Sequence, residues 1–137
     1  MFNDVFEMGK PPNEEAKTMI WVVDRDPDLL EFLEACLVRS LGSEVRALRS
    51  GSAALAALAR TRPDVLVCEL DLPGASGEDV AGAAGRLSRP PSIVLMSDDA
   101  DRLQRARYRA DRLLPKPFPL RELVWSVGTL IAKGANA

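Results

Sequence analysis

The chain has 137 residues, 47% of them hydrophobic and 28% charged, which suits one compact domain and is too short for two. Its formal net charge of −2 at pH 7 gives no overall attraction to nucleic acid or to an anionic membrane. Histidine is absent, which excludes an imidazole base and an imidazole-based metal site.

Residues 1–17 are predicted to form an N-terminal tail and linker, followed by a domain over residues 18–137. The stretch GKPPNEEAK is polar and contains two adjacent prolines, which is typical of a linker. Before it, Phe2, Val5 and Phe6 are spaced like one apolar turn of a helix. That turn either docks on the domain or on a partner, or belongs to a frayed tail, and the sequence leaves both open.

From residue 18 onward, short apolar runs alternate with segments of helical periodicity. In chain order, we expect strand 19–23, helix 27–41, strand 45–48, helix 52–60, strand 65–68, helix 77–87, strand 93–96, helix 99–107, strand 113–114 and a last helix opening at Pro119. Asp26 and Ser52 are the expected caps of the first two helices. Apolar runs of four or five residues are typical of strands buried on both faces. The pattern predicts an α/β fold, a five-stranded parallel sheet with helices on both faces.

Both cysteines, Cys36 and Cys68, lie in apolar stretches without CxxC spacing. We expect two reduced core residues rather than a disulfide, which favours a cytoplasmic location. No stretch approaches the roughly 18 apolar residues of a membrane span, and the N-terminus lacks the order of a signal peptide. The sequence thus predicts a cytoplasmic protein with no membrane partner.

Polar side chains follow four of the predicted strands, at the edge where ligands bind in parallel sheets. They are Asp24, Arg25 and Asp26 after the first strand, Glu69 after the third, Ser97 after the fourth and Lys116 after the fifth. Neither GxGxxG nor GxxxxGK[ST] occurs at a strand-to-helix junction, which excludes a nucleotide cofactor held by such a loop.

Four segments, WVVDRDP, PDVLVCELDLPGASG, IVLMS and LLPKPF, occur in this order along the chain. Together they resemble the receiver domain of two-component response regulators, a CheY-like domain, over about residues 18–133. The resemblance implies a flavodoxin-like (βα)5 fold. It also implies a site with two acids after the first strand, an acceptor Asp ending the third, Ser or Thr ending the fourth, and a Lys-Pro pair, commonly cis, after the fifth.

The sequence keeps part of that site and alters the rest. Asp24, Ser97 and Lys116 match the resemblance, whereas Arg25 stands where it implies a metal-ligating acid and Glu69 stands at the phosphoacceptor position. Arg25 offers a planar fork of donors and is expected to occupy the place of the cation. Asp24 and Glu69 then face two positive charges, so we expect a neutral, chemically silent pocket without metal or cofactor, and no enzyme.

Two other interpretations stay open. In one, Asp26 is the second acid, Arg25 points to solvent, and Asp24, Asp26 and Glu69 hold Mg²⁺; the domain then accepts a phosphoryl group in a histidine-kinase phosphorelay. In the other, the carboxylates only cap helices and Lys116 lies along apolar surface. The longer Glu69 side chain also leaves open a receiver held in an active-like state.

The tract between Arg102 and Arg121 is strongly basic and favours an acidic protein partner at the fourth and fifth helices. The expected output surface comprises Arg102, Arg105, Arg109, Leu113 and Trp125. Leu113 replaces the aromatic residue that the resemblance implies, so a rotating aromatic switch is not expected. The alternative is a solvated face whose arginine stems lie on apolar surface.

The function predicted from these residues is a stand-alone, degenerate receiver, a pseudo-receiver, that acts independently of phosphorylation. It signals through protein contacts, with a histidine kinase or an output protein as the kind of partner, and a homodimer is left open. Nucleic acid is not expected as a partner, because no recognition helix or stacking aromatics accompany the basic tract.

Overall fold

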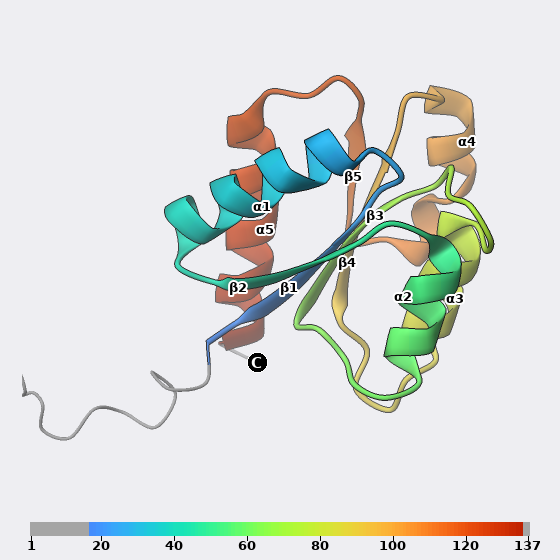
Figure 1. Ribbon diagram of the computed structural model, residues 1–137, viewed down its shortest axis with the longest axis horizontal. Helices are drawn as coiled ribbons and strands as arrows, with labels where there is room; N and C mark the ends of the chain where they lie inside the picture. Colours follow the sequence, from blue (N-terminus) through green and yellow to red (C-terminus); the bar gives the residue numbers. More distant parts are fainter. Residues whose placement is uncertain (1–16, 136–137) are drawn as a thin grey trace, which may run out of the picture.

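The computed structural model describes residues 17–135, in which five parallel strands form one sheet in the order β2-β1-β3-β4-β5 (Figure 1). The strands are β1 (Met19–Val23), β2 (Glu44–Leu48), β3 (Val65–Glu69), β4 (Ser92–Ser97) and β5 (Arg112–Pro115). The helices are α1 (Pro27–Leu41), α2 (Gly51–Leu58), α3 (Gly77–Gly85), α4 (Ala100–Arg105), the 3-10 helix η2 (Arg107–Arg109) and α5 (Leu120–Ala135). The predicted α/β fold is confirmed.

Local chemistry sets where these helices begin and end. The Asp26 carboxylate accepts hydrogen bonds from two backbone amides of the first turn of α1, and Gly42 ends that helix with a φ of 64°. Ser50 caps α2, since its hydroxyl accepts from the Ala53 amide; the expected cap at Ser52 is wrong. The fourth helix is shorter than predicted, because α4 stops at Arg105 and the chain continues as η2.

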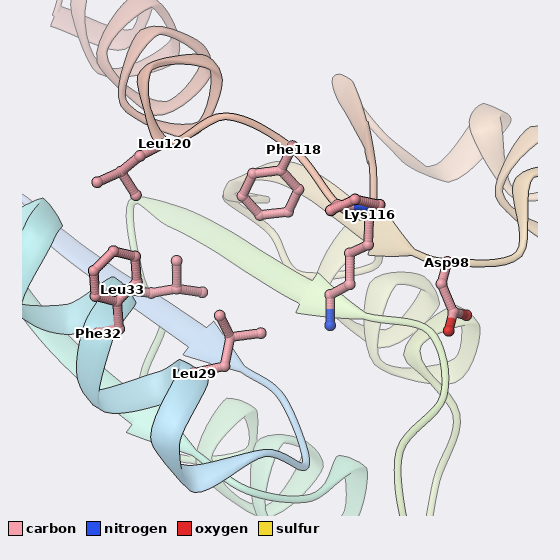
Figure 2. Close-up of a pocket in the computed structure, with 8 residues that line it drawn as sticks. Leu29, Phe32, Leu33, Asp98, Lys116, Phe118 and Leu120 are labelled. Carbon is pink, nitrogen blue, oxygen red and sulfur yellow. The ribbon is translucent and has the colours of Figure 1, made fainter.

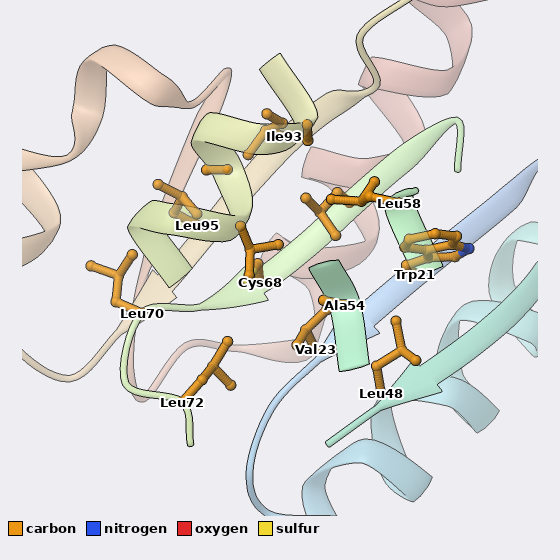
Figure 3. Close-up of a cluster of buried hydrophobic side chains, with 14 of the residues drawn as sticks. Trp21, Val23, Leu48, Ala54, Leu58, Cys68, Leu70, Leu72, Ile93 and Leu95 are labelled. Carbon is orange, nitrogen blue, oxygen red and sulfur yellow. The ribbon is translucent and has the colours of Figure 1, made fainter. Parts of the chain in front are cut away.

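The sheet separates two apolar cores, because successive side chains of each strand face opposite ways. Ile20 and Val22 of β1 pack with α1 and α5, whereas Trp21 and Val23 pack with α2, α3 and α4. Figure 3 shows the second core, with Cys68 at its centre. The order of the strands reverses between β1 and β3, so the carboxyl ends of these strands form the crevice where ligands bind in open α/β sheets.

The two cysteines differ in environment. Cys68 is fully buried, as predicted, but Cys36 lies on α1 and is only partly buried, so the expectation of two core thiols is wrong for Cys36. Burial raises the pKa of the Cys68 thiol, and the nearby carboxylates of Glu69 and Asp24 raise it further.

A thiol reagent is therefore expected to modify only one of the two cysteines in the native protein. Thiolate is the reactive form, so Cys36 reacts while Cys68 stays protonated and shielded. Ellman's reagent under native conditions, compared with the same assay in guanidinium chloride, measures this. Rapid modification of both thiols before unfolding would contradict the burial of Cys68.

No helix within residues 17–135 has the length and apolar character needed to cross a membrane. The predicted tail and its apolar turn at Phe2, Val5 and Phe6 lie outside the described residues, so that prediction stays a prediction.

Candidate functional site

Two buried carboxylates and one lysine meet at the carboxyl edge of the sheet. Asp24 follows β1, Glu69 ends β3, and Lys116 follows β5. The Nζ atom of Lys116 lies 2.7 Å from Asp24 Oδ2 and 2.6 Å from Glu69 Oε1. Asp24 is 1% exposed and Glu69 is 6% exposed. We call these three residues the strand-end triad.

Each carboxylate of the triad also binds a backbone amide through its other oxygen. The Asp26 amide donates to Asp24 Oδ1 at 3.0 Å, and the Asp71 amide donates to Glu69 Oε2 at 3.0 Å. A buried carboxylate is costly unless its oxygens accept hydrogen bonds, and here every carboxylate oxygen has a donor. The strand-end triad is therefore a satisfied network.

The ammonium of Lys116 is the positive charge of this network. Burial by itself lowers the pKa of Lys116, but the hydrogen bonds to Asp24 and Glu69 outweigh burial and hold that pKa above its usual value. The lysine thus stays charged throughout the neutral pH range. Counted formally, two carboxylates against one ammonium give the triad a charge of −1.

Arg25 does not lie between the buried carboxylates, contrary to the sequence-based expectation. Its Nη1 lies 3.3 Å from Asp71 Oδ2, and both side chains of this pair are more than half exposed. Consecutive side chains of an extended segment face opposite ways, so the residue after the inward-facing Asp24 faces solvent. Lys116 therefore supplies the positive charge between the two carboxylates that was predicted for Arg25. The predicted neutral pocket is wrong, because the positive charge of Arg25 lies outside it.

Asp26 caps α1 and does not join the triad. Its Oδ1 accepts from the amides of Asp28 and Leu29 at 3.0 and 3.3 Å. The capping role that the sequence left open is the one seen here, whereas the alternative with Asp26 as a second acid finds no support. The interpretation in which Lys116 only lies along apolar surface is also wrong, since its ammonium pairs with both carboxylates.

The receiver resemblance implies a divalent cation at this edge, and the residues present do not fit one. Both carboxylates of the triad are already bound to an ammonium, and the position of the second acid holds Arg25. Within the part of the chain that the structure describes, no three or more acidic, histidine or cysteine side chains gather into a metal-binding group. Hard divalent cations take several oxygen ligands, and this donor set is too small.

Ser97 ends β4, as expected, next to the start of the loop that leads to α4. Its hydroxyl accepts from the Asp99 amide at 3.0 Å, and its carbonyl accepts from the Lys116 amide at 2.8 Å. The second bond fixes the backbone from which the Lys116 side chain leaves. The Lys116–Pro117 peptide bond is cis, as the resemblance implied.

An apolar groove of about 590 Å³ adjoins the triad on the side of α1 and α5 (Figure 2). Its lining comprises Leu29, Phe32, Leu33, Asp98, Lys116, Pro117, Phe118 and Leu120. Figure 2 shows the ammonium of Lys116 directed away from Phe118 and Leu120. The aliphatic stem of the lysine thus forms part of the groove wall, while its ammonium binds the carboxylates of Asp24 and Glu69.

The residues of the predicted basic output surface do not form one surface in the structure. Arg102 is the first that lies apart from the others. The Nε and Nη2 atoms of Arg102 donate to the two carboxylate oxygens of Glu78 at 2.8 and 2.9 Å, and Nη2 also donates to the Leu70 carbonyl at 3.1 Å. This bidentate pair joins α4 to α3. Arg102 therefore belongs to an internal contact and is not free for a partner.

The other predicted output residues lie in different surroundings. Arg105 is exposed, Leu113 is half-buried against the core beneath α3 and α4, and Trp125 is 62% exposed on α5, as expected. The guanidinium of Arg112 lies 5.9 Å from the centre of the Trp125 ring. Arg109 turns toward α3 instead, so the basic tract faces two directions.

Replacing Arg102 with Ala is expected to lower the free energy of unfolding by about 1–2 kcal/mol, because a bidentate charge-assisted contact is lost. Urea denaturation at pH 7 measures this change. The matched variant Arg105→Ala removes an exposed arginine of the same helix and should change stability by no more than about 0.5 kcal/mol. Equal effects of the two substitutions would mean that the pair with Glu78 does not hold α4.

Two residues of this region were missed at the level of sequence. Asp71 supplies the amide for Glu69 and the carboxylate for Arg25, and Glu78 binds Arg102. Asp71 lies two residues after a strand end, a position from which a backbone amide commonly turns back to the preceding side chain, and that spacing was the available signal. Nothing in the spacing of Glu78 and Arg102 indicates their contact, because they lie on different helices.

The sequence of this chain is similar to those of known signalling proteins. A family model described as the response regulator receiver domain matches residues 20–127. The transcriptional regulatory protein KdpE of Mycobacterium tuberculosis is 35% identical over 122 residues, which cover 88% of this chain and 54% of that protein. The DNA-binding response regulator MtrA of Mycolicibacterium smegmatis is 37% identical over 107 residues, which cover 77% of this chain and 46% of that protein.

Solved structures share the fold. The response regulator protein TrrA of Thermotoga maritima, in complex with Mg²⁺ and BeF, is similar with a TM-score of 0.73 and 27% identity, over 82% of this chain and 98% of that chain. The receiver domain of the Francisella response regulator 1452 has a TM-score of 0.76 at 20% identity, over 85% and 98% of the two chains. The chain spans about half the length of the curated relatives named above.

Proposed function

This chain belongs to the response regulator receiver family, and we propose that within it the domain signals through protein contacts, without phosphorylation at Glu69. One observation carries the proposal: the carboxylate at the phosphoacceptor position has both oxygens engaged. Glu69 binds the Lys116 ammonium through one oxygen and the Asp71 amide through the other. A nucleophile for phosphoryl transfer needs an oxygen free to approach phosphorus in line.

The length of the Glu69 side chain supports the same conclusion. Glutamate carries its carboxylate one methylene, about 1.5 Å, farther from the backbone than aspartate. Phosphoryl transfer depends almost entirely on positioning and on charge neutralisation, and a misplacement of ~1 Å can cost about a hundredfold in rate. Glu69 is thus poorly placed for the step that an aspartate performs in the family.

Charge at the triad argues against transfer as well. A phosphoryl donor is anionic and approaches a carboxylate site only after a cation has neutralised it. Here Lys116 is shared between Asp24 and Glu69, one negative charge remains, and Arg25 is turned away toward Asp71. Within residues 17–135, the triad therefore offers the incoming donor no unshared positive charge.

Protein contacts are the remaining route for a signal, and the surface offers residues typical of interfaces. Trp125 and Tyr108 are 62% and 74% exposed, and each lies beneath a guanidinium, from Arg112 and Arg109 respectively. Tyrosine, tryptophan and arginine are the residues most enriched among those that dominate binding energy. The partner we propose is a histidine kinase or an output protein, and a second copy of this chain is the third option.

A titration with Mg²⁺ and beryllofluoride tests the proposal. Beryllofluoride binds a receiver carboxylate as a phosphoryl mimic, so amide NMR spectra of a phospho-accepting domain change in a saturable, Mg²⁺-dependent way. We expect no such change here, while Thermotoga TrrA, which has been solved with Mg²⁺ and BeF, serves as the positive control. Saturable shifts around Glu69 that require Mg²⁺ would overturn the proposal in favour of a phospho-accepting receiver.

A further inference from the structure

A second groove lies on the face of the sheet opposite α1 and α5, between α3 and η2. It has a volume of about 280 Å³ and is lined by Ala81, Gly82, Gly85, Arg86, Tyr108 and Arg109. None of these residues belongs to the strand-end triad. We call this feature the α3–η2 groove.

Gly82 forms the floor of the groove, and two guanidinium groups converge above it. A β-carbon at position 82 would lie 2.5 Å from Arg109 Nη1, 3.2 Å from Arg109 Cζ and 3.4 Å from Arg86 Nη1. The missing side chain therefore makes room for Arg109 to lie against α3. Glycine in a helix interior costs about 0.5–1 kcal/mol relative to alanine, so its presence here is consistent with a packing role for the bare backbone.

The two converging charges lack a counter-charge within the described chain. Arg86 and Arg109 form no ion pair with a carboxylate of residues 17–135; the only side-chain hydrogen bond of Arg109 in that range is to the Tyr108 hydroxyl, at 3.2 Å. Like charges held close together repel each other, and a carboxylate placed between them relieves that repulsion. The two positive charges of the groove thus favour the binding of an anionic group.

An exposed aromatic ring stands at the edge of the same groove. Tyr108 is 74% exposed, and the guanidinium of Arg109 lies 5.0 Å from the centre of its ring. A ring and a guanidinium stacked in this way form a flat, partly apolar platform beside the charged floor. Such a platform suits the apolar side chain of a neighbouring protein better than it suits an enclosed small molecule.

We propose that the α3–η2 groove binds an acidic segment of a partner protein. A carboxylate side chain of that segment lies between Arg86 and Arg109, and an apolar neighbour packs on Tyr108. This inference rests on the proposed function, because it locates one contact through which a signal would leave the domain. Nucleic acid is disfavoured as the occupant, since the chain carries a net charge of −2 and the groove is short.

The test is an NMR titration with a defined acidic peptide, acetyl-Glu-Glu-Leu-Glu-Glu-Leu-amide, without Mg²⁺ or beryllofluoride. Saturable shifts are expected for the amides of Gly82, Gly85 and Tyr108. The Arg86→Glu/Arg109→Glu variant should weaken binding at least tenfold. The matched variant Arg39→Glu/Arg121→Glu makes the same change in net charge at exposed positions of α1 and α5 and should bind normally.

A second variant tests the groove without altering charge. Gly82→Ala places a methyl group where the Arg109 guanidinium lies, and only the flexible end of that side chain needs to move. We expect a folded protein with peptide binding reduced at least tenfold. Normal binding by Gly82→Ala, or equal loss in the two charge-reversal variants, would overturn the proposed geometry.

Two further probes separate the acidic segment from other anions. Inorganic phosphate and a single-stranded oligothymidylate are titrated at the same ionic strength as the peptide. Weak or absent shifts with both probes support an acidic protein segment as the occupant. If either probe binds at Gly82 and Tyr108 more tightly than the peptide does, the proposal is overturned. The peptide assay is independent of Glu69, so its failure is distinguishable from a failure of the proposed function, which only the Mg²⁺ and beryllofluoride titration reports.

Discussion

The Arg25→Asp/Glu69→Asp variant is expected to bind Mg²⁺ and beryllofluoride in a saturable way. We expect no such binding by the native chain. The first substitution supplies the missing acid and removes a positive charge from its position. The second withdraws the carboxylate by about 1.5 Å, which vacates the space beside Lys116. Together with Asp24, the site then offers three carboxylates to a hard cation.

The same variant is expected to accept a phosphoryl group from acetyl phosphate at least about a hundredfold faster than the native chain, since both positioning and charge neutralisation are restored. In that step a carboxylate oxygen at position 69 forms a bond to phosphorus while the bond to the acetate oxygen breaks and acetate leaves. Phosphate-affinity electrophoresis or intact-mass measurement records the product. Lys116 remains in place to neutralise one oxygen of the bound group.

The single substitutions are the controls for this result. Arg25→Asp alone keeps the long Glu69 side chain engaged by Lys116 and Asp71, and Glu69→Asp alone keeps the arginine at the position of the second acid. Each should remain close to the native chain. A native chain that already binds beryllofluoride, or a double variant that stays silent, would show that these two positions do not govern the chemistry of the site.

Substituting Lys116 with Met is expected to lower the free energy of unfolding by about 3 kcal/mol at pH 7. Removing one partner of a buried ion pair leaves uncompensated buried charge, and here two carboxylates with 1% and 6% exposure lose the one ammonium that pairs with them among the described residues. Urea denaturation followed by circular dichroism measures the loss. Lys133→Met removes an exposed lysine of α5 and should change stability by no more than about 0.5 kcal/mol.

A double variant separates charge from packing in this result. Lys116→Met/Glu69→Gln removes one of the two facing negative charges, so we expect it to be more stable than Lys116→Met alone by at least about 1 kcal/mol. A double variant no more stable than the single one would mean that the lysine contributes through its aliphatic stem in the apolar groove rather than through its charge.

The stabilisation by Lys116 is expected to depend on pH in the alkaline range. Because its pKa is higher in the folded protein than in the unfolded chain, the contribution is fully present below about pH 10.4 and is lost as the pH rises through the folded value. The stability difference between the native chain and Lys116→Met should therefore be constant between pH 7 and 9 and narrower at pH 11. A difference that widens at pH 11 would contradict the direction of the shift.

The two faces of the basic tract give the domain separable contacts. Arg112 and Trp125 lie on the side of α5, whereas Arg109 and Tyr108 lie on the side of α3. Arg102 holds α4 to α3 between them through Glu78. Variants of Trp125 and of Gly82 therefore address different partners or different parts of one partner.

The sequence by itself determined the fold and three members of the site, whereas Arg25 and Asp26, which it also placed there, lie outside the triad. Apolar runs alternating with helical periodicity predict a parallel sheet, and every strand appears within two residues of its expected bounds. Because strand ends of such a sheet meet at one edge, the spacing also predicts that Asp24, Glu69 and Lys116 lie together. The exchange of an acid for Arg25, and of aspartate for Glu69, is visible without any structure.

Only the tertiary structure decided which charges meet. Arg25 is adjacent to Asp24 in sequence yet pairs outward with Asp71, whereas Lys116, 92 residues away, reaches both buried carboxylates. Likewise, one run of arginines separates into an internal pair at Arg102 and, at Arg109, a charge that forms no ion pair within residues 17–135. The reason is that burial and the direction of each side chain select ionic partners, and both depend on how distant elements pack rather than on distance along the chain.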